Sequence, residues 1–313
     1  MWSEKSIGWC VAGKRSELHD SKKDSRKAMT GLGEHKLEYE TVGPFVTHVW
    51  LHHKDGHNHY AARPVRKGVR WIRPMQLSKK EQTEYVVCAK KINYWVAVLF
   101  MVGSSLFAIP GFLPASLAPA FNVIFFCGSI FFTSAAYLQL VESINKDITN
   151  PALFRTQRCH WIRWAWRPKN LGYLSSLVQF VGTLLFNVNC ISPFFLVTPL
   201  QMDVVIWGSG MLGSICFLIS CAFAWLEISR DPMVKPFRSE EWWIVWVNIA
   251  GSIAFQVSSA VAFYLPQTGD VFAPVLASVG LTFGAICFFI GAFLLRVEDA
   301  IDSQKFIGGD YAQ

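Results

Sequence analysis

Charged residues are scarce in this chain, and several long stretches contain none. Lys, Arg, Asp and Glu make up 16% of the 313 residues, whereas an average soluble domain has about 25%. The first charged residue after Lys91 is Glu142, which leaves 50 uncharged residues between them. The further uncharged runs are Asn170–Met202, Val204–Leu226, Trp242–Gly269 and Val271–Leu295. Because one membrane-spanning helix needs about 20 consecutive apolar residues, this pattern excludes a soluble enzyme and a secreted disulfide-linked domain.

Sequence motifs of catalysis and metal binding are also missing. The chain has no HExxH, GxSxG or GxxxxGK[ST] pattern, and its eight cysteines include no CxxC pair. Most cysteines lie within apolar runs, where small buried hydrophobic residues are expected. We therefore expect no enzyme activity, no metal and no cofactor. The net charge of +7 comes from cations that border the apolar runs, so we do not expect nucleic-acid binding.

The apolar runs predict an all-α integral membrane protein with six transmembrane helices arranged as three repeated hairpins. The 50-residue run is too long for one helix, and three prolines, at positions 110, 114 and 119, lie where it should turn back. The expected spans are residues 93–114, 120–142, 171–196, 203–228, 242–265 and 271–296. A β-barrel would need alternating polar and apolar residues, which runs such as Val123–Phe132 do not show.

The cations predict the orientation of these helices. Of the 29 Lys and Arg residues, 18 precede the first span, 6 lie between the second and third, 3 between the fourth and fifth, and 2 at or after the end of the sixth. The other three turns contain none. Since positive residues stay on the cytoplasmic side, both termini are expected in the cytoplasm.

The chain can then be divided by composition. The expected segments are a disordered basic tail (1–40), a cytoplasmic hairpin with a juxtamembrane helix (41–91), membrane hairpins (92–145, 170–229 and 242–297), an interfacial helix (146–169), a cytoplasmic loop (230–241) and a cytoplasmic tail (298–313).

The cytoplasmic N-terminal region predicts one β-hairpin. Residues 1–40 have many polar residues and no apolar period, which is typical of disorder. Phe45–His53 and His57–Ala61 read as two strands around an Asp-Gly turn. The sequence Ser78-Lys-Lys-Glu81 fits a capping box, so a helix leading into the first span should begin there.

The hairpin is rich in histidine. It carries His48, His52, His53, His57 and His59. A structural zinc site needs four ligands in tetrahedral geometry, and no cysteine or carboxylate pattern completes one. The sequence favours exposed strand histidines, with a metal site as the alternative.

The segment Asn150–Arg167 predicts a helix in the membrane interface. At about 100° per residue Phe154, Trp161 and Trp164 share one face and several arginines fall outside it, while Arg158 and Trp166 break the pattern. The candidate lipid-interface residues are Arg155, Trp161, Arg163, Trp164 and Arg167. Such a helix can recognise an anionic lipid or serve only as a Trp/Arg anchor between spans, and the second reading is favoured.

Each expected span contains a glycine followed four residues later by a phenylalanine. The six pairs are Gly103 and Phe107, Gly128 and Phe132, Gly182 and Phe186, Gly213 and Phe217, Gly251 and Phe255, and Gly284 and Phe288. Five of the six glycines are followed directly by Ser or Thr. A small residue one turn from a large one predicts close helix packing at the middle of the membrane.

These tandem apolar helices with a central V-G-S-x-x-F core resemble the YrhK-like domain, a two-helix membrane module of unknown role. The stretch Trp95–Phe107 carries the resemblance most clearly. It extends over about the last 220 residues as three hairpins and leaves the first 90 unexplained. The resemblance implies a multi-pass membrane protein and transfers no catalytic or ligand-binding residue.

Two amides, Asn187 and Gln256, directly follow a motif phenylalanine in spans expected to run outward. They are candidates for lining a small polar pocket. The favoured alternative is that each amide forms a hydrogen bond between helices, worth about 0.6 kcal/mol.

The sequence thus favours a non-enzymatic multi-pass membrane protein whose cytoplasmic face contacts anionic lipid or a partner. The partner could be a second copy of the chain or another protein bound through the N-terminal region. The alternative is a carrier or channel for a small solute through the helix bundle, because transporters often contain repeats around a central site.

Overall fold

The computed structural model describes residues 28–32, 35–53, 56–67, 79–146, 164–195, 198–229 and 239–307. Most of these residues form six long helices: α3 (Lys79–Ala108), α4 (Ala118–Asn145), α6 (Leu171–Ile191), α8 (Gly208–Ile228), α9 (Glu240–Val261) and α10 (Pro274–Ile307). Each includes or adjoins a segment long and apolar enough to cross a membrane. The prediction of six helices compatible with a multi-pass membrane protein is therefore confirmed.

The segments that could cross a membrane are Lys90–Phe112, Ala120–Asn145, Leu171–Phe194, Met202–Ile228, Glu240–Val261 and Pro274–Ile301. They agree with the expected spans to within a few residues. The main differences are polar extensions, since α3 begins at Lys79 and α10 continues to Ile307, well beyond their apolar parts. These extensions bring charged residues to one end of the bundle.

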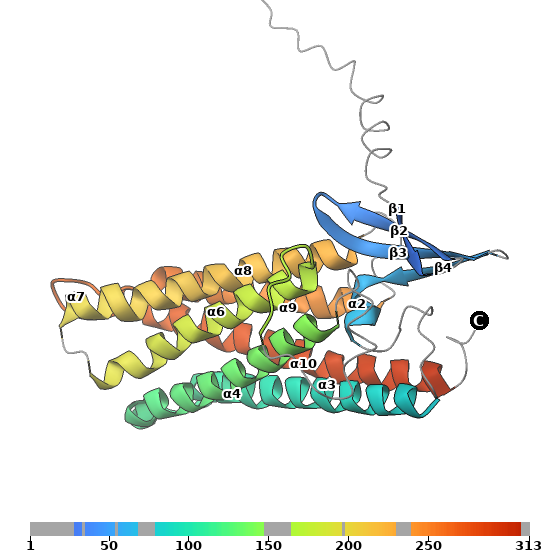
Figure 1. The fold of residues 1–313 in the computed structure, drawn as a ribbon. Coiled ribbons are helices and arrows are strands. Elements are labelled where there is room, and N and C mark those ends of the chain that lie inside the picture. Colours follow the sequence, from blue (N-terminus) through green and yellow to red (C-terminus); the bar gives the residue numbers. More distant parts are fainter. Residues whose placement is uncertain are drawn as a thin grey trace, which may run out of the picture.

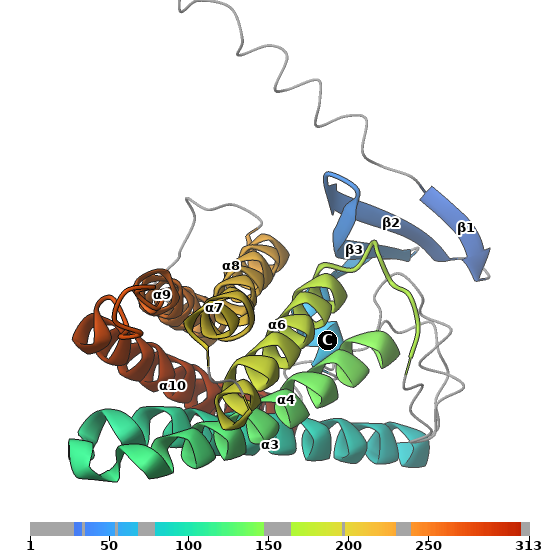
Figure 2. The same cartoon turned by 90° about the vertical axis from the view of Figure 1, so that its left-hand side faces the viewer.

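The six helices form a closed ring (Figure 2). Each helix packs on the one before and the one after it in the order α3, α4, α6, α8, α9, α10, and α10 returns to α3. Short elements connect them: η1 (Ile109–Phe112), η2 (Ala115–Leu117), η3 (Ser192–Phe194), α7 (Pro199–Gln201) and the π-helical turn η4 (Met202–Trp207).

Helix starts follow ordinary capping chemistry. The Asn170 side chain accepts a hydrogen bond from the Tyr173 amide at 3.0 Å at the start of α6. Ser239 does the same for the Trp242 amide at 3.3 Å at the start of α9. Such caps satisfy amides that have no partner within the helix.

A four-stranded antiparallel sheet of order β1-β2-β3-β4 precedes the bundle. Its strands are β1 (Ala28–Leu32), β2 (His35–Val42), β3 (Phe45–His53) and β4 (Gly56–Ala61). The expected hairpin is confirmed, because β3 pairs with β4 and His53 lies opposite Gly56.

The expected disorder over residues 1–40 is wrong for 28–32 and 35–40, which lie in β1 and β2. The polar composition of β2 hid its pairing with the more apolar β3, in which Tyr39 lies opposite Val49. Tyr39 also packs against the small sheet core around Val49 and Leu51. Residues 1–27 lie outside the described part of the chain.

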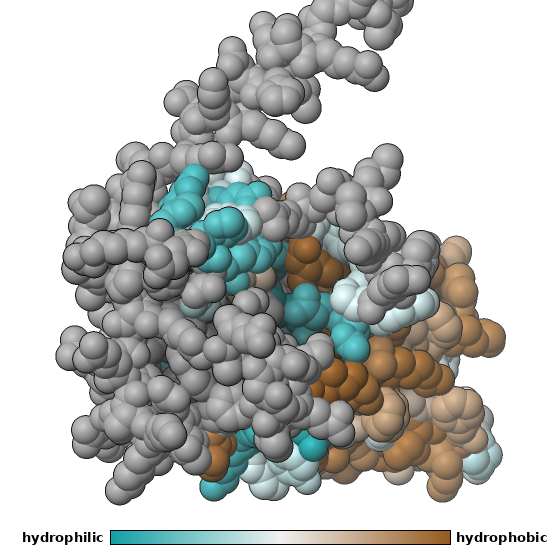
Figure 3. All heavy atoms as spheres, turned by 90° about the vertical axis from the view of Figure 1, so that its right-hand side faces the viewer, coloured by the Kyte–Doolittle hydropathy of each residue, from teal (hydrophilic) through white to brown (hydrophobic). Residues whose placement is uncertain are grey.

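The sheet lies at one end of the bundle (Figure 1). We call this the sheet end and the opposite one the far end. The five-residue helix α2 (Ala62–Arg66) follows β4 directly and connects the sheet to the bundle. Seen from the sheet end, hydrophilic residues lie beside the strongly hydrophobic side of the bundle (Figure 3).

Candidate functional site

Eight charged side chains are buried together at the sheet end, none more than 8% exposed. We call them the charge cluster. Its cations are Arg63, Arg66, Lys67 and Lys146, and its acids are Glu142, Glu227, Glu298 and Asp299. The cluster joins α2 and the residue after it to α4, α8 and α10. Four cations and four acids give it a formal charge of zero.

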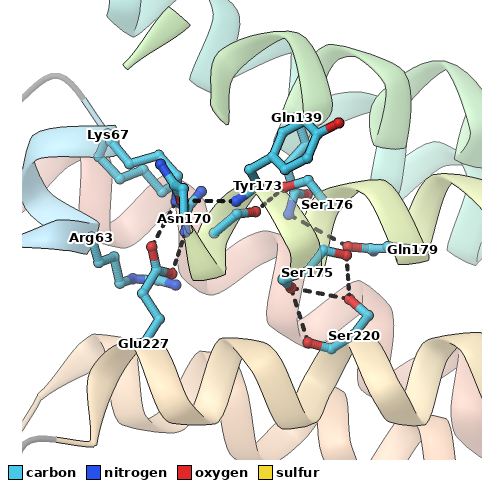
Figure 4. A network of polar contacts seen from close by, with 12 residues as sticks. Arg63, Lys67, Gln139, Asn170, Tyr173, Ser175, Ser176, Gln179, Ser220 and Glu227 are labelled. Carbon is cyan, nitrogen blue, oxygen red and sulfur yellow. Dashed lines mark hydrogen bonds and ion pairs between the residues drawn. The ribbon is translucent and has the colours of Figure 1, made fainter. Parts of the chain in front are cut away.

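Two bidentate arginine–carboxylate pairs hold α2 in place. Arg63 donates from Nε and Nη2 to the two carboxylate oxygens of Glu298, at 3.1 and 3.2 Å. Arg66 donates in the same way to Glu227, at 3.0 and 2.8 Å. Glu227 reaches from α8 toward α2 in Figure 4. Paired donors of this kind match a carboxylate in geometry as well as charge.

The lysines complete the cluster. Lys67 Nζ lies 3.6 Å from Glu298, and Lys146 Nζ lies 3.1 Å from Glu142 on the preceding turn of α4. Asn93 on α3 donates from Nδ2 to the Lys67 carbonyl at 3.1 Å and to Asp299 at 3.2 Å. Every charge in the cluster therefore has an opposite charge or a polar group nearby.

The cluster shifts the pKa values of its cations in different directions. Burial opposes the charged form of Arg63 and Arg66, but the nearby carboxylates, chiefly Glu298 and Glu227, outweigh burial and raise both pKa values. For Lys146 burial prevails over the attraction of Glu142, so its pKa is lowered. The two arginines remain fully charged, and Lys146 loses its proton more readily than an exposed lysine would.

A cavity lies directly below the cluster, inside the ring of helices. Its volume is about 80 Å³, well above the roughly 10–15 Å³ that one buried water requires. All six long helices line it, and four charged residues, Arg63, Arg66, Lys67 and Glu142, close its sheet end. Its uncharged polar lining consists of Gln139, Ser175, Gln179, Ser220, Asn248 and Ser252.

Some of these polar groups already bond to one another across helices (Figure 4). The Ser175 hydroxyl donates to the Ser220 carbonyl at 2.9 Å, and the Ser220 hydroxyl donates back to the Ser175 carbonyl at 2.8 Å. Gln139 donates from Nε2 to the Gln179 Oε1 at 3.4 Å. The amides of Gln139 and Gln179 keep donor and acceptor capacity for another molecule.

The six motif phenylalanines meet at the other side of the cavity. Their rings contact one another repeatedly, for example Phe217 and Phe288 at 5.8 Å and Phe107 and Phe255 at 6.4 Å between centroids. All six are buried, with at most 8% exposed. Phe217 and Phe288 also line the cavity, so the rings separate it from the far half of the bundle.

The motif glycines allow this arrangement within each pair of consecutive helices. A Cβ added to Gly103 would lie 3.0 Å from the carbonyl oxygen of Gly128, and one added to Gly128 would lie 3.2 Å from that of Gly103. The other two helix pairs show the same reciprocal approach, through Gly182 with Gly213 and Gly251 with Gly284. Each glycine also lies against the motif phenylalanine of its partner helix.

The amides expected to line a pocket lie elsewhere. Asn187 accepts a hydrogen bond from the Thr133 hydroxyl at 3.1 Å. Gln256 accepts one from the Ser214 hydroxyl at 3.0 Å and donates to the Met211 sulfur at 2.9 Å. Both connect neighbouring helices, and neither lines the cavity described above.

Only part of the expected lipid-interface segment is described. Trp164 is exposed and Arg167 is half-buried, and residues 164–167 are irregular rather than helical. The expected helix therefore does not continue through Arg167. Arg155, Trp161 and Arg163 lie outside the described residues.

The histidine-rich hairpin places its aromatic rings side by side on one sheet face. His48 stacks on His59 at 4.9 Å, and Trp50 lies 4.4 Å from His59. The His52 Nε2 lies 2.9 Å from Glu38 on β2. Among the described residues, no three His, Cys, Asp or Glu side chains converge as metal ligands would.

The charge cluster and the cavity were not anticipated from the sequence, although a signal exists. Glu142, Glu227 and Glu298 each follow a motif glycine by 14 residues, at Gly128, Gly213 and Gly284. In the structure these three glutamates occupy the same level, the sheet end of α4, α8 and α10, and each meets a cation.

The fold and site thus define a helical bundle compatible with a multi-pass membrane protein, with a capped internal cavity. Comparison with protein-family models, with curated proteins and with solved structures found no match for this chain. Membership of the YrhK-like domain remains a prediction.

Proposed function

We propose that this protein is a membrane carrier that binds a small solute in the central cavity. The observation that supports this proposal is a cavity with polar side chains at the centre of a ring of six apolar helices. Buried polar groups at this depth are costly unless they serve packing or a ligand. A few polar groups in a concave, otherwise apolar site are typical of small-molecule binding.

We further propose that the three pairs of consecutive helices are structural repeats. The reciprocal glycine contacts in each pair and the glutamate 14 residues after the second glycine support this. Repeats around an axis along the membrane normal, with the substrate between them, occur in known carriers.

In this proposal α2 is a cap and the phenylalanine rings are a barrier. The solute enters from the sheet end when Arg63 and Arg66 separate from their glutamates, and leaves when the rings separate. The distribution of Lys and Arg supports a cytoplasmic position for the sheet end.

Reporter fusions test this orientation. A reporter after Gln313 should be active as a cytoplasmic fusion, and one inserted after Ala115 should be active as an external one. Ala115 lies in η2, between α3 and α4, at the far end of both helices. A reporter at Gln313 found outside the cell would contradict the orientation, whatever the function.

Cysteine labelling tests the carrier itself. Ala224 lines the cavity, whereas Ala222 on the same helix is exposed on the outside of the bundle. Ala224→Cys and Ala222→Cys are made in the full chain with its eight native cysteines replaced by serine. The protein is then reconstituted in vesicles and treated on each side with a membrane-impermeant methanethiosulfonate.

A carrier exposes its cavity to each side in turn, so Ala224→Cys should react from both sides. Ala222→Cys, which faces lipid in this proposal, should react from neither. Reaction of Ala224→Cys from one side only, or from no side, would rule out a carrier.

The second candidate is the function favoured by the sequence, a non-enzymatic protein whose cytoplasmic face contacts anionic lipid or a partner. The observations that favour it are the exposed rings of Trp164 and Trp166 next to Arg167. A Trp/Arg surface is suited to the headgroup region of a membrane. This candidate predicts no labelling of Ala224→Cys from the far side.

A further inference from the structure

The charges around the cavity leave nothing for an ionic ligand to neutralise. The four cations and four acids of the charge cluster balance one another, and the two arginines, Lys67 and Lys146 each have a carboxylate within 3.6 Å. Below the cluster, the cavity lining contains no charged side chain. An anion or cation bound there would remain uncompensated in a low-dielectric site, which is strongly unfavourable.

The neutral groups below the cluster, in contrast, have unused hydrogen-bonding capacity. Asn248 lines the cavity from α9 and makes no hydrogen bond to any described residue. A Cβ added to Gly291 on α10 would lie 2.6 Å from its Oδ1, so the absence of a side chain there leaves space for this amide. An amide without a protein partner in such a place is unfavourable unless another molecule bonds to it.

A pair of amides on α4 and α6 lines the same cavity. Gln139 and Gln179 share one hydrogen bond of 3.4 Å, which leaves the Gln179 amide hydrogens and the Gln139 oxygen available. Asn248, Gln139 and Gln179 together offer both donors and acceptors. Phe100, Phe217 and Phe288 make the rest of this part of the cavity apolar.

We infer that the cavity binds a small neutral molecule that both donates and accepts hydrogen bonds, of the polyol or amide class. The cavity volume of about 80 Å³ is smaller than the roughly 150 Å³ cavity that accommodates benzene, so we expect a ligand of about the size of glycerol or acetamide. Asn248 and Gln179 are its main hydrogen-bonding partners. This inference rests on the proposed function, since it names the solute that the carrier would accept.

Protection of a cavity cysteine tests the ligand class. The full-length Ala224→Cys protein in detergent reacts with iodoacetamide, and the rate is measured with glycerol, acetamide, sodium formate or methylammonium chloride at equal osmolality. Glycerol or acetamide should lower the rate at Ala224→Cys at least threefold, with no such change at Ala222→Cys. The two salts should not lower the rate at either position. Asn248→Leu and Gln179→Met each remove one of the two amides and keep a side chain of similar size. The slowing by glycerol and acetamide should be lost in both variants.

Gln256→Leu is the matched control, because it removes an amide from the same helix but outside the cavity. It should keep the protection by the neutral solutes. Protection by formate or methylammonium alone, protection that survives both cavity substitutions, or no protection by any solute would overturn the inference. The labelling of Ala224→Cys from the two sides of the vesicle uses no solute. A negative result in the protection experiment would therefore refute this ligand class without refuting the carrier proposal.

Discussion

Replacing Arg66 by Met should cause one of the largest losses of stability available in this protein. Glu227 is buried, with 3% of its surface exposed. The substitution removes the guanidinium that binds both of its carboxylate oxygens. Removing one partner of a buried ion pair costs about 3–5 kcal/mol. We expect a clearly lower melting temperature in detergent, measured by intrinsic tryptophan fluorescence or by the loss of monodisperse protein.

The double variant Arg66→Met with Glu227→Leu separates the charge from the packing. Replacing both partners by apolar residues is often neutral or stabilising, so the double variant should recover most of the lost stability. Arg167→Met is a suitable control, because Arg167 is half-buried outside the charge cluster. A single variant as stable as the unmodified protein would show that α2 is not held by these charges.

Substituting the motif glycines should give the second large effect. In Gly182→Ala the new Cβ would meet the Gly213 carbonyl oxygen at 3.1 Å, and in Gly251→Ala the Gly284 carbonyl oxygen at 3.0 Å. Backbone atoms of a packed helix cannot move aside easily, so overpacking should cost about 1–3 kcal/mol. Detergent melting temperatures of the two variants should fall accordingly.

Gly208→Ala is the matched control for both glycine variants. Its Cβ would approach only the Asp203 carbonyl oxygen, at an ordinary 3.5 Å. Alanine is also the better helix former by about 1 kcal/mol, so this variant should melt at the same temperature or higher. Equal melting of all three variants would contradict the role of the motif glycines in helix packing.

The helices could be predicted from the sequence because the signal is local. An uncharged run and the prolines at its turn, such as Pro110, lie next to each other in the chain, and only a helix satisfies every backbone group of such a run within a bilayer. The capping pattern Ser78-Lys-Lys-Glu81 likewise predicted the start of α3, which begins at Lys79.

The site could not be predicted in the same way, because its partners are far apart in the chain. Arg66 and Glu227 are separated by 161 residues, and Arg63 and Glu298 by 235. The sequence predicts how deep Asn187 and Gln256 lie within their spans. It does not predict which way their side chains point, because that depends on the positions of the neighbouring helices. Both turn toward a hydroxyl on the next helix, at Thr133 and Ser214, rather than into the cavity.

The contacts of α2 with α8 and α10 also determine when α2 can dock during synthesis of the chain. The ribosome makes α2 before any helix of the bundle, yet Glu298 is made 235 residues after Arg63. At about 5–20 residues per second, this interval lasts roughly 10 to 50 seconds. During that time Arg63 lacks the carboxylate that it later pairs with, so its guanidinium group is expected to stay in water. We therefore expect docking of the N-terminal sheet to be the final step of assembly, after the last turns of α10 have emerged.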